Sequence, residues 1–142
     1  MAQPFWTMSR VADAISGFRP AEGRAARLGP SGDGFPRGDQ PIVRVWTDTR
    51  SVAAGDLFVA LRGDNFDGHD FLSQAVTAGA AAVVVSDATR AAGLGVPAFV
   101  VADTTRALGA LGRYRRDVWA RPVVAVGGSN GKTSTKELIR AA

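Results

Sequence analysis

The sequence contains no cysteine and only one histidine, His69. Without cysteine there are no disulfides and no thiolate metal sites, and a single histidine cannot form a histidine cluster for zinc. No apolar run approaches the roughly 20 residues that span a membrane. The N-terminus has no basic residue before Arg10, which argues against a signal peptide. We therefore expect a cytoplasmic protein.

The chain does have a moderate excess of positive charge and enough apolar residues for a core. The formal net charge is +4 and 46% of the 142 residues are hydrophobic, which suits one domain of ordinary size. The arginines are spread out, apart from a cluster at Arg113, Arg115, Arg116 and Arg121. A basic domain could bind nucleic acid, but such a cluster is more often the solvated C-terminal end of a helix. Small anionic substrates are the better explanation of the surplus.

The stretch from Val123 to Thr135 has the order strand, glycine-rich loop and helix. The loop reads Gly127-Gly128-Ser129-Asn130-Gly131 and continues into Lys132-Thr133. Its glycines let backbone N–H groups surround an anion, Lys132 can reach the β- and γ-phosphates of a nucleotide, and Thr133 can hold Mg²⁺. The full phosphate-loop pattern needs glycine at Val126, so a plain turn with a solvated lysine stays the alternative.

Apolar patterns predict strands that alternate with helices, and hence an α/β domain with a sheet that is at least partly parallel. The predicted strands are residues 42–46, 56–61, 81–85, 97–102 and 123–126. The predicted helices begin near Thr7, Phe71, Asp87, Asp103 and Lys132. Residues 19–41 are rich in glycine and proline, which favours a loop. Residues 122–142 supply too few strands to bury their own, so they indicate the opening of a second domain.

The first polar segment of interest, Asp48-Thr49-Arg50, follows a predicted strand. Arginine suits phosphate through its two-pronged guanidinium, and ligands of α/β sheets often lie at the carboxyl ends of strands. The alternative is a surface turn with a local salt bridge.

The second segment runs from Asn65 to Phe71. Asn65, Asp67 or His69 could hold a polar ligand. Alternatively the segment is a capping turn, with Asp67 as the cap, Gly68 for geometry, and Phe66 and Phe71 in the core. His69 has no paired nucleophile, so a structural or substrate-contact role is favoured over that of a general base.

Several motifs, in the order in which they follow one another along the chain, resemble the N-terminal domain of Mur ligases. The phosphate loop resembles the ATP loop of the same family. These motifs are residues 47–50, 55–63, 66–71, 79–81 and 128–137. The likeness runs from about Thr7 to the last residue. It implies a small mixed α/β domain for a UDP-sugar at residues 1–120. Residues 121–142 would supply the first strand, phosphate loop and helix of a central ATP-binding domain.

The string of residues 66–71 and the Lys136-Glu137 pair after the phosphate loop look most like the family member that adds D-alanyl-D-alanine to UDP-N-acetylmuramoyl-tripeptide. That resemblance implies an ATP- and Mg²⁺-dependent ligase of peptidoglycan precursor synthesis, and so of cell-wall biogenesis, cell shape and cell division. It implies that the substrate carboxylate is activated as an acyl phosphate. It implies no nucleic acid partner and no membrane span.

Residue by residue, the resemblance implies that Gly127 to Thr133 wrap the ATP phosphates. Lys132 and Thr133 would act in catalysis, with Thr133 also ligating Mg²⁺. The residues that would face the UDP-sugar are Asp48, Thr49, Arg50, Asn65, Asp67 and His69.

Three features depart from the family pattern. Gly127 stands where the family commonly has threonine, the loop of residues 19–41 is longer than usual, and the sequence stops at Ala142. We therefore expect the 142-residue chain alone not to catalyse ligation. Two alternatives remain: a UDP-sugar-binding module without catalysis, or another Mur ligase such as the enzyme that adds the third residue.

Overall fold

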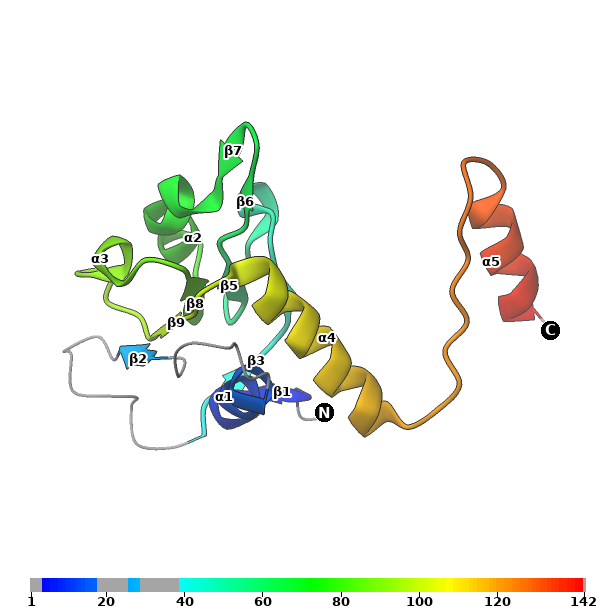
Figure 1. Ribbon diagram of the computed structural model, residues 1–142, viewed down its shortest axis with the longest axis horizontal. Coiled ribbons are helices and arrows are strands. Elements are labelled where there is room, and N and C mark those ends of the chain that lie inside the picture. The colour runs from blue at the N-terminus through cyan, green and yellow to red at the C-terminus, as the bar shows by residue number, and fades with distance from the viewer. Residues whose placement is uncertain (1–3, 18–25, 29–38, 142) are drawn as a thin grey trace.

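The computed structural model describes residues 4–17, 26–28 and 39–141 (Figure 1). The strands are β1 (Trp6–Thr7), β2 (Ala26–Leu28), β3 (Pro41–Ile42), β4 (Val45–Trp46), β5 (Leu57–Val59), β6 (Arg62–Gly63), β7 (Phe66–Asp67), β8 (Ala82–Val85) and β9 (Ala98–Val100). The helices are α1 (Met8–Gly17), α2 (Leu72–Thr77), α3 (Ala88–Ala91), α4 (Thr104–Trp119) and α5 (Lys132–Ala141), with 3₁₀ turns η1 (Thr49–Ser51) and η2 (Gly68–Phe71).

The main sheet has five strands in the order β2-β9-β8-β5-β4. Strands β4, β5, β8 and β9 run parallel, and β2 pairs with β9 in the antiparallel sense at one edge. The prediction of a partly parallel sheet is therefore confirmed. Parallel strands need crossover connections, which α2 supplies between β5 and β8 and α3 between β8 and β9.

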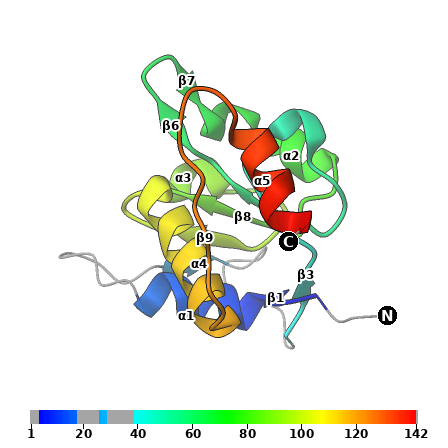
Figure 2. The same ribbon diagram turned by 90° about the vertical axis from the view of Figure 1, so that its right-hand side faces the viewer.

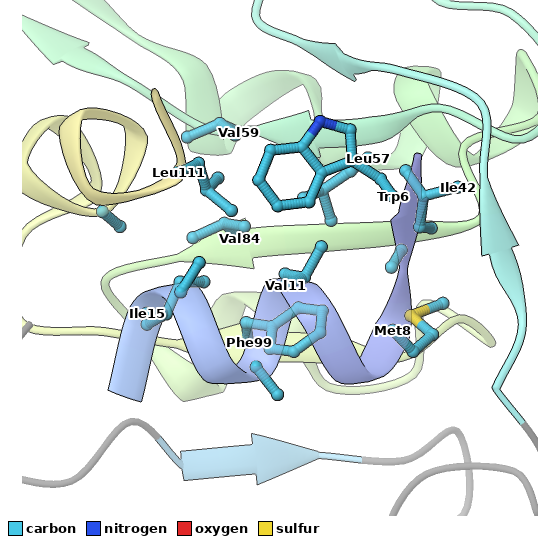
Figure 3. Packing of buried hydrophobic residues seen from close by; sticks show 14 residues of the cluster. Trp6, Met8, Val11, Ile15, Ile42, Leu57, Val59, Val84, Phe99 and Leu111 are labelled. Atoms are coloured by element: carbon cyan, nitrogen blue, oxygen red, sulfur yellow. The ribbon is translucent and has the colours of Figure 1, made fainter. Parts of the chain in front are cut away.

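Helices cover both faces of this sheet (Figures 1 and 2). Successive residues of a strand point to opposite faces, so β5 sends Leu57 and Val59 toward α1 and α4 and sends Phe58 toward α2. Figure 3 shows the first of these cores, in which Val11 of α1 and Leu111 of α4 pack with the strand side chains. All four residues of β8 are buried, as expected for a strand covered on both sides.

Side-chain caps begin three of the helices where the sequence predicts them. The Thr7 hydroxyl accepts from the Arg10 N–H (3.3 Å), the Asp87 carboxylate from the Thr89 N–H (2.9 Å), and the Asp103 carboxylate from the Arg106 N–H (3.0 Å). Each cap satisfies a backbone donor that has no intrahelical acceptor. Helix α4 ends at Trp119, and the next residue, Ala120, has a left-handed φ of 50° although it is not glycine.

The prediction of one strand over residues 42–46 is wrong. Ile42 pairs with Trp6 in a small separate sheet, whereas Val45 pairs with Leu57 in the main sheet. Between them the Val43 N–H donates to the Gly55 carbonyl (2.9 Å), and the chain passes from one sheet to the other.

The loop predicted at residues 19–41 is also corrected, because β2 forms within it. Most of its other residues lie outside the described ranges.

The predicted strand at residues 123–126 is not formed, although α5 after it is. Val123 and Val124 are 61% and 68% exposed, and no other described strand pairs with this segment. An isolated extended segment has no ladder hydrogen bonds to hold it as a strand. Along α4, Ala107 and Leu111 are buried, whereas Val118 near the end of the helix is 53% exposed.

No helix in the described part of the chain combines the length and the apolar character needed to cross a membrane.

We predict that Gly79→Ala destabilises the fold by about 2 kcal/mol. Gly79 has a φ of +105°, and an added Cβ would lie 2.9 Å from the Ala54 Cα. Unfolding by denaturant measures the effect. Gly109→Ala is the matched control, because Gly109 lies in α4 with nothing within 4 Å of an added Cβ. It should stabilise the chain by roughly 0.5–1 kcal/mol. A Gly79→Ala variant as stable as the wild type would contradict this account.

Candidate functional site

The parallel strands bring several polar segments to one edge of the sheet. Segment 47–51 follows β4, segment 62–71 follows β5, and segment 86–90 follows β8. Because the carboxyl ends of parallel strands meet at the same edge, these segments are neighbours there. We call them together the carboxyl edge. The hairpin of β6 and β7 projects from this edge beyond the sheet (Figure 1).

Asp48 and Arg50 form a closed pair at the start of η1. Asp48 Oδ1 accepts from the Arg50 backbone N–H (3.0 Å) and from Nε (2.9 Å), and Oδ2 accepts from Nη2 (2.7 Å). The Arg50 side chain is 86% exposed. The local salt bridge of the alternative prediction is thus present, and a ligand phosphate would have to compete with Asp48 for the guanidinium.

A network around the buried Asp56 was missed by sequence reasoning. Asp56 is fully buried and accepts from Arg44 Nε (2.8 Å) and from the Ala53 N–H (2.7 Å). Arg44 Nη2 also donates to the Ser51 carbonyl (2.7 Å), and its guanidinium carbon lies 4.0 Å from the centroid of the Trp46 ring. The signal was available: a carboxylate that begins an apolar strand needs a partner when buried.

The carboxylate of Asp67 is occupied within the chain. Its Oδ1 accepts from the His69 N–H (2.9 Å) and lies 2.6 Å from His69 Nδ1, while Oδ2 accepts from Arg62 Nη2 (2.8 Å). The His69 backbone N–H, with the Arg62 guanidinium and the His69 ring, holds the pKa of Asp67 well below its usual range. The capping turn predicted as the alternative therefore describes Asp67.

His69 is buried, with 4% of its surface exposed. Its Nε2 accepts from the Ser86 N–H at 2.9 Å. Because a backbone N–H can only donate, that nitrogen carries no proton and Nδ1 donates to Asp67. With both nitrogens engaged, the ring serves the structure rather than acting as a general base.

The residues around His69 divide between structure and surface. Gly68 must be glycine, since an added Cβ would meet the Leu61 carbonyl oxygen at 2.8 Å. Phe66 is 49% exposed, so its predicted place in the core is wrong. It stacks on Phe71 instead, with ring centroids 5.4 Å apart. Asn65 lies exposed in the turn between β6 and β7.

The predicted phosphate loop leads directly into α5. Gly128 and Gly131 have φ values of +133° and +76°, and nothing lies within 4 Å of a Cβ added at Gly131. The Lys132 ammonium donates to the Gly128 carbonyl. The first N–H groups of a helix lack intrahelical acceptors, so this open loop fits a phosphate. Mg²⁺ at Thr133 would depend on the nucleotide phosphates for further ligands.

The structure thus groups six of the predicted residues and leaves the others apart. The six at the carboxyl edge are Asp48, Thr49, Arg50, Asn65, Asp67 and His69. The phosphate loop is exposed and stands away from the sheet in Figure 1.

The protonation of the Asp48 carboxyl should show whether Asp48 is paired with Arg50. Hydrogen bonds from the Arg50 side chain, and then from its backbone N–H, lower the pKa of Asp48 from 3.8 to about 2. A carboxyl pKa lowered by folding stabilises the folded chain above the unfolded pKa, and this contribution is lost as the pH falls through about 2. We predict that Arg50→Ala raises the pKa of Asp48 toward 3.8 in an NMR titration. Arg113→Ala should not, and a wild-type pKa near the ordinary value would contradict the pairing.

Comparison with known proteins identifies the family. A family model described as "Mur ligase family, catalytic domain" matches residues 41–116, more than half of the chain. The UDP-N-acetylmuramoyl-tripeptide–D-alanyl-D-alanine ligase of Synechocystis sp. is 48% identical over 103 residues, which cover 72% of this chain and 23% of that protein. The UDP-N-acetylmuramoyl-L-alanyl-D-glutamate–2,6-diaminopimelate ligase of Geobacter sulfurreducens is 40% identical over 108 residues, which cover 74% and 21%.

Solved structures agree with these sequence matches. A UDP-N-acetylmuramoylalanyl-D-glutamyl-2,6-diaminopimelate–D-alanyl-D-alanyl ligase from Acinetobacter baumannii superposes with a TM-score of 0.73 at 35% identity, covering 96% of this chain and 27% of that one. The MurF ligase of Thermotoga maritima, solved in complex with ADP, gives 0.54 at 36% identity and covers 68% and 22%. The chain spans about a quarter or less of these relatives. It belongs to the Mur ligase family.

Proposed function

We propose that this chain provides the UDP-sugar-binding domain and the phosphate loop of an ATP-dependent ligase. The ligase joins D-alanyl-D-alanine to UDP-N-acetylmuramoyl-tripeptide in peptidoglycan precursor synthesis, in the cytoplasm. The observation that carries the proposal is the 48% identity, over 72% of the chain, to a ligase named for that reaction. The chain spans 23% of that relative, and the proposed ligation is that of the full-length protein.

The proposed domain boundary lies near residue 120, where α4 ends. Residues 1–120 would bind the UDP-sugar, and residues 121–142 would open the ATP-binding domain. The exposed surface of α5 supports this division, since Leu138 is 72% and Ile139 is 49% exposed. Apolar side chains of this size on one helix favour burial against further chain.

In the proposed reaction ATP supplies the phosphoryl group that activates the tripeptide carboxylate, and the amine of D-alanyl-D-alanine then displaces it as phosphate. The chain's own part is to bind and orient. Backbone N–H groups at the start of α5 would hold phosphate oxygens, and the Lys132 ammonium would leave the Gly128 carbonyl to neutralise their charge. The Thr133 hydroxyl would hold Mg²⁺.

The UDP-sugar is proposed to lie on the carboxyl edge. Thr49, Arg50 and Asn65 follow neighbouring parallel strands there, which is where ligands of α/β sheets bind. The Arg50 guanidinium is the best suited of these groups to a diphosphate. The carboxylates of Asp48 and Asp67 are already hydrogen-bonded within the chain, so a direct role for them requires an exchange of partners.

A second candidate is the ligase that adds the third residue of the peptide. The 40% identity to the Geobacter sulfurreducens protein, over 74% of this chain, favours it. The two candidates differ in the acceptor, which is UDP-N-acetylmuramoyl-tripeptide in one and the corresponding dipeptide in the other. Tighter binding of the dipeptide form would favour the second candidate. The remaining alternative is a module that binds the UDP-sugar without catalysis. In that case the UDP-sugar would bind, but the full-length protein would give no ligation.

We predict that the purified chain binds UDP-N-acetylmuramoyl-tripeptide with one-to-one stoichiometry in a calorimetric titration. Arg50→Ala should weaken this binding by roughly 10- to 100-fold, the loss of one charged hydrogen-bonding group. Arg113→Ala is the matched control, because Arg113 is also exposed and pairs with a nearby aspartate. A wild-type chain that is folded by circular dichroism but binds no UDP-sugar would overturn the proposed function.

The phosphate loop is tested separately with Mg-ATP. We predict that Lys132→Ala lowers the affinity for Mg-ATP by roughly tenfold or more and leaves UDP-sugar binding unchanged. Lys136→Ala serves as the control, since Lys136 lies on the same helix one turn further along. Equal losses in both variants would show that general charge, rather than the loop, attracts the nucleotide.

A further inference from the structure

His69 joins two loops of the carboxyl edge. Its Nδ1 lies 2.6 Å from Asp67 Oδ1, at the end of β7, and its Nε2 accepts from the Ser86 N–H (2.9 Å), directly after β8. The imidazole side chain is 1% exposed, so water does not compete for either bond. Since β5 and β8 are neighbours in the sheet, the ring ties the segment after β5 to the segment after β8.

The connection continues into the hairpin of β6 and β7. Asp67 Oδ2 accepts from Arg62 Nε (3.2 Å) and Nη2 (2.8 Å), and Arg62 lies on β6 opposite Asp67 on β7. The chain of bonds therefore runs from the Ser86 backbone through His69 and Asp67 to Arg62. A two-stranded hairpin on its own is only marginally stable in water. These bonds fix it to the sheet.

We propose that His69 is a positioning residue of the UDP-sugar site. It holds the hairpin that carries Asn65 in its binding geometry before the ligand arrives. Ordering a loop on binding costs affinity, so a loop that is already fixed binds more tightly. This inference rests on the proposed function, and it assigns to His69 an indirect role in place of ligand contact.

The polarity of the ring argues against simple core filling. An apolar side chain would fill the same volume without needing partners, whereas a buried imidazole must have both nitrogens satisfied. Both partners of His69 lie in carboxyl-edge segments, and Gly68 beside it packs against Leu61 so closely that a Cβ would clash. The position of the ring is thus set from both sides.

One experiment needs no ligand. The chain has a single histidine, so the ¹⁵N imidazole spectrum contains the signals of His69 alone. We expect the tautomer protonated at Nδ1 and a slowly exchanging Ser86 amide proton. A spectrum that shows the Nε2-protonated tautomer, or an averaged and mobile ring, would overturn the proposed connection.

The second experiment separates positioning from stability with two partial replacements. Asparagine places a donor near the position of Nδ1, so His69→Asn can keep the bond to Asp67; glutamine reaches the position of Nε2, so His69→Gln can keep the bond to Ser86. Ile15→Val in the core, where Ile15 is 5% exposed, is the control that lowers stability without touching either loop. Calorimetry with UDP-N-acetylmuramoyl-tripeptide is done at a temperature where all three variants are folded.

We expect both His69 variants to bind the UDP-sugar about tenfold more weakly than the wild type, and Ile15→Val to bind normally. If the His69 variants melt at lower temperature but bind with wild-type affinity, His69 is only structural and the inference fails while the proposed function stands. If the folded wild-type chain binds no UDP-sugar, the proposed function fails together with the ligand named here. The tautomer and the Ser86 amide would then still show whether His69 joins the two loops.

Discussion

The parallel pairing of β4, β5, β8 and β9 determines where the polar segments that follow these strands lie. Each of these strands is short, and β5 and β8 are buried throughout, so neither has room for polar chemistry within the strand. The polar residues of the candidate site follow the strands instead. Because all four strands point the same way, the segments that follow them collect at one edge. The two cores on either side of the sheet hold that edge in place.

Each arginine of this edge is paired with an aspartate. Arg50 is paired with Asp48, Arg62 with Asp67, and Arg90 with Asp70. The three pairs differ in exposure: the Asp67 side chain is 23% exposed, against 40% for Asp48 and 60% for Asp70. Exposed ion pairs contribute little to stability, so their arginines can change partners at low cost. The more buried pair, held by His69, is the one suited to a structural role.

Much of this arrangement could be read from the sequence because the signals were local. The run Ala82–Val85 is apolar without interruption, and Asp87 and Asp103 precede helices as caps do. The polar segments after β4 and β5 were recognised from their side chains alone. Whether these side chains bind a ligand or each other depends on the distances between them, which the sequence does not give. The bidentate contact of Arg50 with Asp48 became evident only in the structure.

The failures were failures of long-range pairing. Residues 42–46 look like one strand, yet Ile42 finds its partner in β1 and Val45 in β5. Residues 123–126 have the composition of a strand but no described neighbour to pair with. Phe66 was assigned to the core by its apolarity, although a hairpin that leaves the sheet carries it outward. In each case the amino-acid composition indicated a local preference, and the contacts available from distant parts of the chain determined the structure that formed.

The left-handed residue at the end of α4 has a mechanical consequence. Helices usually leave through glycine at such a position, and glycine permits many exit directions. Ala120 accepts roughly 1 kcal/mol of backbone strain there, and its N–H stays bonded to the Arg116 carbonyl (3.1 Å). A residue with a Cβ has few neighbouring conformations to move into. The chain therefore leaves α4 within a narrow range of directions at Ala120, and the mostly exposed residues after it, which pair with no described strand, lead on to the phosphate loop.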